Sequence, residues 1–310
     1  MNFLELKTVS KSYRNHFWSR AVPALQDLSF VVPQKGITGF VGPNGAGKTT
    51  SIKILLGLLT PTAGSAYIRG VPSHLPEARR NVAYVSEQPY FYHHLTARES
   101  LTFAYRLNRY PPDKLTAEID RVLQTVQLTA IGDKKIHTLS KGMQQRLNMA
   151  HALLGNPSIY ILDEPMSGLD PLGRRLFRDL FLDLAAKDKC LFFSTHIIED
   201  IERLCKYVIA LDKGAMVYAG SLDELLARNT AGAEIHVDAI PENIIGRLHE
   251  RGYTVTTVDP DNRIIHVPTD KEAQVCQKLL YEHNIFPKTI SRRTASLESI
   301  LYKSAEVRRP

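Results

Sequence analysis

Two stretches of this sequence, far apart along the chain, contain the residue types that bind phosphate. The segment GPNGAGKT, residues 42–49, fits the pattern G-x-x-x-x-G-K-[ST]. Its glycines let backbone N–H groups converge on phosphate oxygens, while Lys48 supplies charge and Thr49 can place its hydroxyl on Mg²⁺. The segment LSKGMQQRL, residues 139–147, is a turn that runs into a helical pattern and is suited to an anion. The sequence therefore predicts two anion sites but only one phosphate loop.

A buried strand that ends in two acids supplies the complementary groups. The segment SIYILDEP, residues 158–165, is a continuous apolar run that stops at Asp163 and Glu164. Asp163 can hold Mg²⁺ directly or through water, and Glu164 can take a proton from an attacking water. Such an acid pair alone usually marks only the end of a strand. Together with the phosphate loop it indicates nucleotide hydrolysis.

The elements around these residues predict an α/β domain. A short β-rich run, GITGFVG, precedes the phosphate loop, and the apolar segment KTTSIKILLGLL, residues 48–59, predicts a buried helix after it. Apolar and polar residues alternate over residues 1–35, which is typical of half-buried antiparallel strands. Residues 95–155 are mostly helical in pattern. Because helices then alternate with buried strands, we expect a mainly parallel sheet.

The composition changes near residues 227–232, and a second pattern follows. Its six segments read as strand, helix, strand, strand, helix and strand, the βαββαβ order of a ferredoxin-like domain. We therefore predict two domains, residues 1–228 and 232–305. The second contains no recognisable catalytic set, so we expect it to contact a second subunit or to regulate the first domain.

The bulk composition narrows the class of protein. The chain has 310 residues, 44% of them hydrophobic, and a net charge of +7. No apolar run approaches the roughly 18 residues that would span a bilayer, and the first residues lack the apolar core of a signal peptide. The three cysteines form no CxxC pair, which argues against disulfides or a metal site. These features predict a cytoplasmic protein.

Five motifs stand in one order along the chain: the phosphate loop, LSKGM, LDEP, SGLD and STH. This set resembles the nucleotide-binding subunit of ATP-binding cassette (ABC) transporters over about residues 1–228. The resemblance implies a P-loop ABC ATPase fold with a mainly parallel core sheet, an antiparallel β subdomain and a helical subdomain. It implies ATP and Mg²⁺ as ligands. The phosphate-loop residues that it assigns to the nucleotide are Gly42, Pro43, Asn44, Gly45, Ala46, Gly47, Lys48, Thr49 and Thr50.

The resemblance also assigns roles around the nucleotide. Tyr13 matches the family's aromatic residue that stacks on adenine, although the nearby Phe17 or Trp18 could compete for that role. A core aromatic is the alternative for Tyr13. The family's Q-loop glutamine, which senses the γ-phosphate and metal, falls on Glu87, with Gln88 next to it. His196 matches the switch histidine that holds the γ-phosphate. With Glu164 as the base and Asp163 and Thr49 at the metal, the implied reaction is ATP hydrolysis.

The second anion stretch matches the family's signature motif. There, Ser140 and Gly142 bind the γ-phosphate of ATP held by the opposite subunit, and Asp170 belongs to the D-loop that crosses the dimer interface. A plain helix N-cap is the alternative for Ser140. Lys141 replaces a family glycine and could face either the phosphate or solvent. The residues at helical spacing after the turn predict a buried face made of Met143, Leu147, Ala150 and Leu154.

The resemblance implies partners as well. We expect a second cassette, giving a homodimer, and a separate multi-span membrane permease that places the chain peripherally on the cytoplasmic face of the cell membrane. The forms SKGMQQR, SGLDP and SLESIL are most like cassettes that serve ABC-2-type exporters. The alternative is a soluble ABC ATPase that acts on nucleic acid or the ribosome, which the basic charge supports. The chain shows neither two cassettes nor a long coiled-coil insert, so we expect no nucleic acid partner. A third alternative, a cassette that binds ATP without turnover, is weakened by Glu164 and His196.

Overall fold

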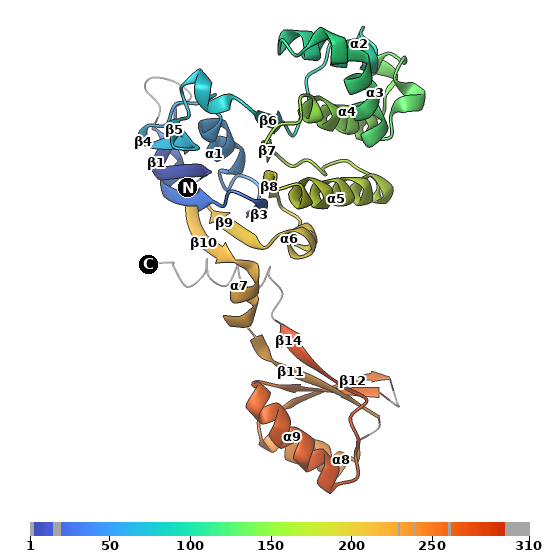
Figure 1. Cartoon of the computed structure of the whole chain (residues 1–310). Helices are drawn as coiled ribbons and strands as arrows, with labels where there is room; N and C mark the ends of the chain where they lie inside the picture. Colours follow the sequence, from blue (N-terminus) through green and yellow to red (C-terminus); the bar gives the residue numbers. More distant parts are fainter. Residues whose placement is uncertain (1–2, 15–19, 229, 239, 260–261, 295–310) are drawn as a thin grey trace. The chain divides into compact units, whose positions relative to one another are not determined.

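The protein is represented by a computed structural model that describes residues 3–14, 20–228, 230–238, 240–259 and 262–294 (Figure 1). The chain divides into two compact units, Met1–Leu222 and Asp223–Pro310. This division falls at the start of helix α7 (Leu222–Arg228). The predicted boundary, at residues 228–232, lies after this helix.

A six-stranded, mainly parallel sheet forms the centre of the first unit, as the sequence predicted. Its strand order is β10-β9-β3-β8-β7-β6. Every neighbouring pair is parallel except β10 with β9. Strands β7 and β8 are buried along their whole lengths, which explains their continuous apolar runs. The strands are β3 (Gly36–Val41), β6 (Val82–Val85), β7 (Ile159–Leu162), β8 (Cys190–Thr195), β9 (Tyr207–Asp212) and β10 (Ala215–Ser221).

A four-stranded antiparallel sheet, in the order β2-β1-β4-β5, packs on this centre (Figure 1). The alternating pattern of residues 1–35 is confirmed as its strands β1 and β2. Aromatic rings connect the two sheets. The ring centroid of Phe30 on β2 lies 5.6 Å from that of Phe40 on β3, which lies 5.0 Å from that of Phe192 on β8. The strands are β1 (Leu4–Tyr13), β2 (Val22–Val32), β4 (Ala63–Ile68) and β5 (Val71–Pro72).

Helix α1 (Lys48–Leu55) follows the phosphate loop but is shorter than the predicted helix, which extends to residue 59. Gly57 ends it in a left-handed conformation with φ of 64°. A Cβ at this position would lie 2.2 Å from the carbonyl oxygen of Ser73, so only glycine fits there. The local pattern predicted the apolar face but not the end of the helix, which Gly57 sets.

Three helices separate β6 from β7 and form the helical part of the first unit, at the top of Figure 1: α2 (Ala97–Leu107), α3 (Leu115–Thr125) and α4 (Lys141–Leu153). Along α4, the predicted buried face is confirmed at Leu147, Ala150 and Leu154. It is wrong at Met143, which is 38% exposed. Met143 lies in the first turn of the helix, where it lines a surface pocket instead of the core.

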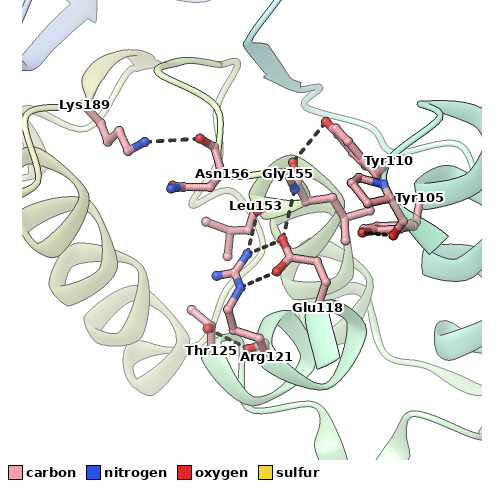
Figure 2. Close-up of polar contacts among 11 residues, drawn as sticks. Tyr105, Tyr110, Glu118, Arg121, Thr125, Leu153, Gly155, Asn156 and Lys189 are labelled. Atoms are coloured by element: carbon pink, nitrogen blue, oxygen red, sulfur yellow. Dashed lines mark hydrogen bonds and ion pairs between the residues drawn. The ribbon is translucent and has the colours of Figure 1, made fainter. Parts of the chain in front are cut away.

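Side chains of α3 bind the C-terminal end of α4 (Figure 2). The Arg121 guanidinium contacts both carboxylate oxygens of Glu118 at 2.7 and 2.8 Å and donates to the Leu153 carbonyl oxygen at 2.9 Å. The Glu118 carboxylate accepts the Gly155 N–H at 3.0 Å. The hydroxyl of Tyr110 donates to the Leu154 carbonyl oxygen. The Leu153 and Leu154 carbonyls are among the backbone groups that every helix end leaves unpaired, and these bonds fix the end of α4 against α3.

After α7, the second unit has the predicted βαββαβ order. Its four strands form a sheet in the order β12-β13-β11-β14 with every pair antiparallel. Helices α8 and α9 pack on the sheet around a core that includes Ile235, Ile265 and Leu280. Residues 260–261, between β12 and β13, and residues 295–305, which include SLESIL, lie outside the described residues. The elements are β11 (Thr230–Val237), α8 (Glu242–Glu250), β12 (Thr254–Asp259), β13 (Asn262–Val267), α9 (Asp270–Glu282) and β14 (Thr289–Thr294).

The remaining helices are α5 (Pro171–Ala186) and α6 (Ile198–Leu204), with 3₁₀ turns at Pro76–Arg79, Pro112–Lys114, Thr129–Ile131 and Ile136–Thr138. The longest helix of the described residues, α5, has 16 residues. Within the described ranges, no helix combines the length and the apolar character that crossing a membrane requires.

Candidate active site

The phosphate loop connects the end of β3 to the start of α1. Gly45 and Gly47 have φ of 81° and 101°, left-handed values that glycine adopts without steric cost. The Lys48 side chain is only 7% exposed, and its amine donates to the carbonyl oxygens of Gly42 at 2.7 Å and Pro43 at 3.3 Å. The loop therefore curves around its own lysine, and the amine is positioned before any phosphate binds.

A pocket of about 530 Å³ opens beside the loop. Its walls join segments that are far apart in the sequence, because β3, β6, β7 and β8 end at the same edge of the sheet. The residues that line it are Ala24, Asn44, Gly45, Ala46, Gly47, Lys48, Thr49, Thr50, Glu87, Glu164, Ser167 and His196. Most of the predicted nucleotide residues, the predicted base and the predicted switch histidine thus share one pocket.

Glu164 occupies a constrained position in this pocket. Its φ of 46° is left-handed, which is costly for a residue with a Cβ. Its carboxylate, 10% exposed, lies 3.4 Å from the Lys48 amine and 3.0 Å from Nδ1 of His196. Its backbone N–H donates to the Ser194 hydroxyl at 2.9 Å. The carboxylate is therefore oriented by two side chains and can accept a proton from a water in the pocket.

Asp163 lies beneath the pocket wall rather than on it. It is 1% exposed, and its Oδ1 accepts the Ser194 hydroxyl at 2.6 Å. Mg²⁺ bound with nucleotides takes one or two protein oxygens and completes its shell with phosphate and water. Thr49 in the pocket and Asp163 just below it provide hard oxygen donors of this kind. Among the described residues, no group of three or more His, Cys, Asp or Glu is placed to hold a metal ion.

The second anion stretch borders a different pocket, of about 450 Å³. Ser140 is the N-cap of α4, and its hydroxyl accepts the Met143 N–H at 3.2 Å. Asp170 caps α5 in the same way through the Gly173 N–H. The residues that line this pocket are Gln127, Leu128, Ala130, Ile131, Ser140, Lys141, Gly142, Met143, Arg146, Gly168 and Asp170. The structure thus brings Ser140, Gly142 and Asp170 together, apart from the phosphate-loop pocket.

Lys141 is exposed, but its side chain does not extend freely into solvent. Its aliphatic stem packs over Gly168, where a Cβ would lie 3.0 to 3.5 Å from three of its carbons. Arg146, which lies 3.7 Å from the Asp170 carboxylate, adds a second cation to the pocket. The pocket therefore carries two positive side chains and one acid beside a helix N-terminus, a combination that favours an anion.

Tyr13 and Glu87 can now be placed. Tyr13 is 43% exposed at the end of β1, so it is not a core aromatic, and its hydroxyl lies 3.4 Å from the Thr50 hydroxyl. Phe17 and Trp18, the competing aromatic residues, lie outside the described residues. Of the two Q-loop candidates, Glu87 lines the phosphate-loop pocket, and the carbonyl of Gln88 accepts the Ser86 hydroxyl.

Comparison with known proteins decides the family. An uncharacterised ABC transporter ATP-binding protein of Bacillus subtilis is 33% identical over 97% of this chain and 98% of its own length. The chain belongs to the family of ABC transporter ATP-binding proteins. The family profile described as ABC transporter matches residues 25–167 of this cassette. An uncharacterised ATP-binding protein of Nostoc is 42% identical over 71% of the chain and 67% of its own. The Nod factor export ATP-binding protein I of Rhizobium meliloti is 35% identical over 70% of this chain and 64% of its own length.

Solved structures agree with the fold of the cassette. A structure described as the ATP-binding subunit of an ABC transporter superposes with a TM-score of 0.65 at 32% identity, covering 73% of this chain and 92% of that one. A dimeric structure of the bacterial ABC transporter cassette MJ0796 superposes with a TM-score of 0.65 at 25% identity, covering 71% and 99%. The predicted P-loop ABC ATPase fold is therefore confirmed.

The structure gives contacts to residues for which the motifs assigned no individual role. Ser194, the first residue of the STH motif, is buried and bonds both Asp163 and Glu164. Ser167 lines the phosphate-loop pocket, although we assigned its motif to the dimer interface. Arg146 lies within the stretch LSKGMQQRL, but its residue type did not indicate the contact with Asp170.

Proposed function

We propose that this chain is the ATP-binding and ATP-hydrolysing subunit of an ABC exporter, and that its domain of residues 1–228 performs the reaction. The observation that best supports this proposal is the arrangement of Lys48, Glu164 and His196 around one pocket on a phosphate loop. Family membership supports ATP hydrolysis. The export direction rests on the similarity to a relative named for Nod factor export.

The residues divide the reaction between binding and proton transfer. Lys48 and the loop N–H groups bind the β- and γ-phosphates, and Tyr13 at the end of β1 stacks on the base. Lys48 now contacts Glu164, so an arriving phosphate replaces that carboxylate as its partner and leaves Glu164 free to act as a base. Water attacks the γ-phosphorus, its proton passes to Glu164, and the bond to the β-phosphate oxygen breaks.

Other residues complete the transition state. Thr49 and Asp163 would hold Mg²⁺, which supplies positive charge to the phosphates, and Glu87 faces the same pocket. His196 orients the Glu164 carboxylate through Nδ1, and its other ring nitrogen is then left to contact the γ-phosphate. Preorganised groups of this kind supply most of the catalysis in phosphoryl transfer.

We infer that the working unit is a dimer of cassettes. The anion pocket at Ser140 and Gly142 lies apart from the phosphate loop of the same chain, so it gains a use when a second copy brings its own ATP to it. Two copies head to tail would complete two sites. The dimeric structure of a similar cassette supports this arrangement.

The membrane-spanning partner is part of the same proposal. Transport needs a path through the bilayer, and the relatives are named as the ATP-binding proteins of transporters. We propose that a separate multi-span permease supplies the path, which places this chain peripherally on the cytoplasmic face of the membrane. ATP-driven closing and opening of the cassette dimer would move the helices of that partner.

Glu164→Gln tests the function most directly. The amide keeps the shape of the side chain but cannot take the proton, so ATP binding should persist while turnover falls at least about 100-fold. With Mg·ATP, the variant should accumulate as a dimer in gel filtration, and the parent chain should not. Glu199→Gln, on the exposed face of α6, is the matched control and should behave as the parent. Undiminished hydrolysis by Glu164→Gln would reject Glu164 as the base.

A further inference from the structure

Three backbone polar groups of Glu164 and Pro165 make hydrogen bonds. The Glu164 N–H donates to the Ser194 hydroxyl at 2.9 Å, and its carbonyl oxygen accepts the Ser167 N–H at 3.0 Å. The next carbonyl, of Pro165, accepts the side-chain amide of Gln145 at 2.9 Å. A left-handed backbone on a residue with a Cβ persists only where its surroundings fix it. These three bonds are what fix it here.

Of the three residues that bond this backbone, Gln145 is the one that lies on α4. It lies on α4, five residues after the N-cap Ser140, and is 3% exposed. The first turn of α4 lines the second anion pocket. One short helix segment thus borders that pocket at Ser140 and reaches the peptide beside Glu164 through Gln145.

A second buried side chain of α4 makes the connection rigid. The Asn148 amide, 8% exposed, donates to the Ser86 carbonyl oxygen at 2.9 Å, directly before Glu87. Gln145 and Asn148 lie three residues apart and therefore on one face of the helix. Helix α4 is thus hydrogen-bonded to the backbone next to Glu164 and to the backbone next to Glu87, and both acids line the phosphate-loop pocket. A shift of this helix would move both.

We propose that Gln145 is a positioning residue, which makes the placement of the Glu164 carboxylate depend on α4 and hence on occupation of the second anion pocket. The amide does not touch substrate. It fixes the Pro165 carbonyl, and with it the left-handed backbone that aims Glu164 into the phosphate-loop pocket. The proposal rests on the proposed function of Glu164 as the base.

The test is Gln145→Met in the full chain, because methionine nearly matches glutamine in length but cannot donate a hydrogen bond. Gln144→Met is the matched control, since the neighbouring amide donates to carbonyl oxygens that precede the helix, those of Leu139 at 3.2 Å and Ile136 at 3.5 Å, and not to the Pro165 carbonyl. ATP affinity should stay within about twofold, while kcat should fall about 10- to 100-fold, the cost of a misplaced reacting group. The Mg·ATP dimer should then accumulate in Gln145→Met but not in Gln144→Met.

A merely structural role gives a different result. Turnover is therefore divided by the number of ATP molecules bound per chain, and thermal unfolding is recorded for each variant. Partial unfolding lowers the number of bound ATP but leaves kcat per bound ATP unchanged, which would overturn the proposal. A Gln145→Met chain that hydrolyses as fast as the parent would overturn it too. If the Glu164→Gln chain hydrolyses ATP as fast as the parent, the proposed function of Glu164 is rejected instead.

Discussion

The ion pair between Lys48 and Glu164 offers a test of the site that needs no nucleotide. The amine and carboxylate lie 3.4 Å apart, and their side chains are 7% and 10% exposed. Lys48→Met keeps the aliphatic stem but leaves the carboxylate with only His196 beside it. It also leaves the carbonyls of Gly42 and Pro43 without a donor. Glu164→Gln removes the opposite charge. Each single variant should therefore be destabilised, and the double variant should not suffer both losses in full.

The magnitude follows from what each variant leaves unpaired. Breaking a buried pair costs about 3–5 kcal/mol, but Glu164 keeps His196 and Lys48 keeps two carbonyls, so we expect about 2–3 kcal/mol for each single variant. The double variant should be about 1–3 kcal/mol more stable than the sum of the singles predicts. For a unit of this size, about 2 kcal/mol lowers Tm by about 4–8 °C.

Urea unfolding and thermal unfolding without nucleotide at neutral pH measure all four members of the cycle. Lys53→Met, at an exposed position on the same helix, is the control and should leave stability unchanged within about 0.5 kcal/mol. Additive losses within about 0.5 kcal/mol would show that Lys48 and Glu164 do not interact in the folded chain, against the reasoning above. In the same variants, Lys48→Met should weaken ATP binding about 10- to 100-fold, measured by titration with a fluorescent ATP analogue.

Three further results are expected. Ser140→Arg should leave ATP binding by the monomer intact but abolish the Mg·ATP dimer of the Glu164→Gln chain in gel filtration; a normal dimer would reject the second pocket as a half-site. Tyr13→Ala should weaken ATP binding about 5- to 50-fold and inorganic triphosphate binding not at all, because only the base stacks on the ring. Arg121→Ala should lower the free energy of unfolding by about 1.5–3 kcal/mol at pH 7, since it removes charged hydrogen bonds to Glu118 and to the end of α4. The Arg121 hydrogen bond holds the pKa of Glu118 below its ordinary 4.5. The difference in free energy of unfolding between the parent and Arg121→Ala should therefore be full above that pH and shrink as the pH falls below it. A difference that does not change with pH in urea titrations at pH 3.5–7 would contradict this.

Local patterns predicted the elements of this chain well where one physical cause dominates. The buried strands β7 and β8 are continuous apolar runs because both faces of a parallel sheet are covered. The six elements that follow α7 in the second unit were predicted in order because each is short and strongly patterned. Local patterns failed at Met143 and at the end of α1. At the end of α1 the left-handed Gly57 interrupts the apolar pattern, and at the start of α4 Met143 lines a surface pocket instead of the core.

The sequence by itself determined which chemistry is available to this protein. The phosphate loop, the paired acids and the ordered motifs can be identified from residue types and spacing, because backbone donors, an amine and carboxylates at those intervals suit a nucleotide and little else. Only the tertiary structure decided which of these residues meet. It gathered Glu87, Glu164 and His196 beside the phosphate loop and left Ser140 at a separate pocket. It also supplied bonds with no local signal, such as that of Gln145 to the peptide beside Glu164. Contacts of this kind join segments that are remote in sequence, so no local pattern encodes them.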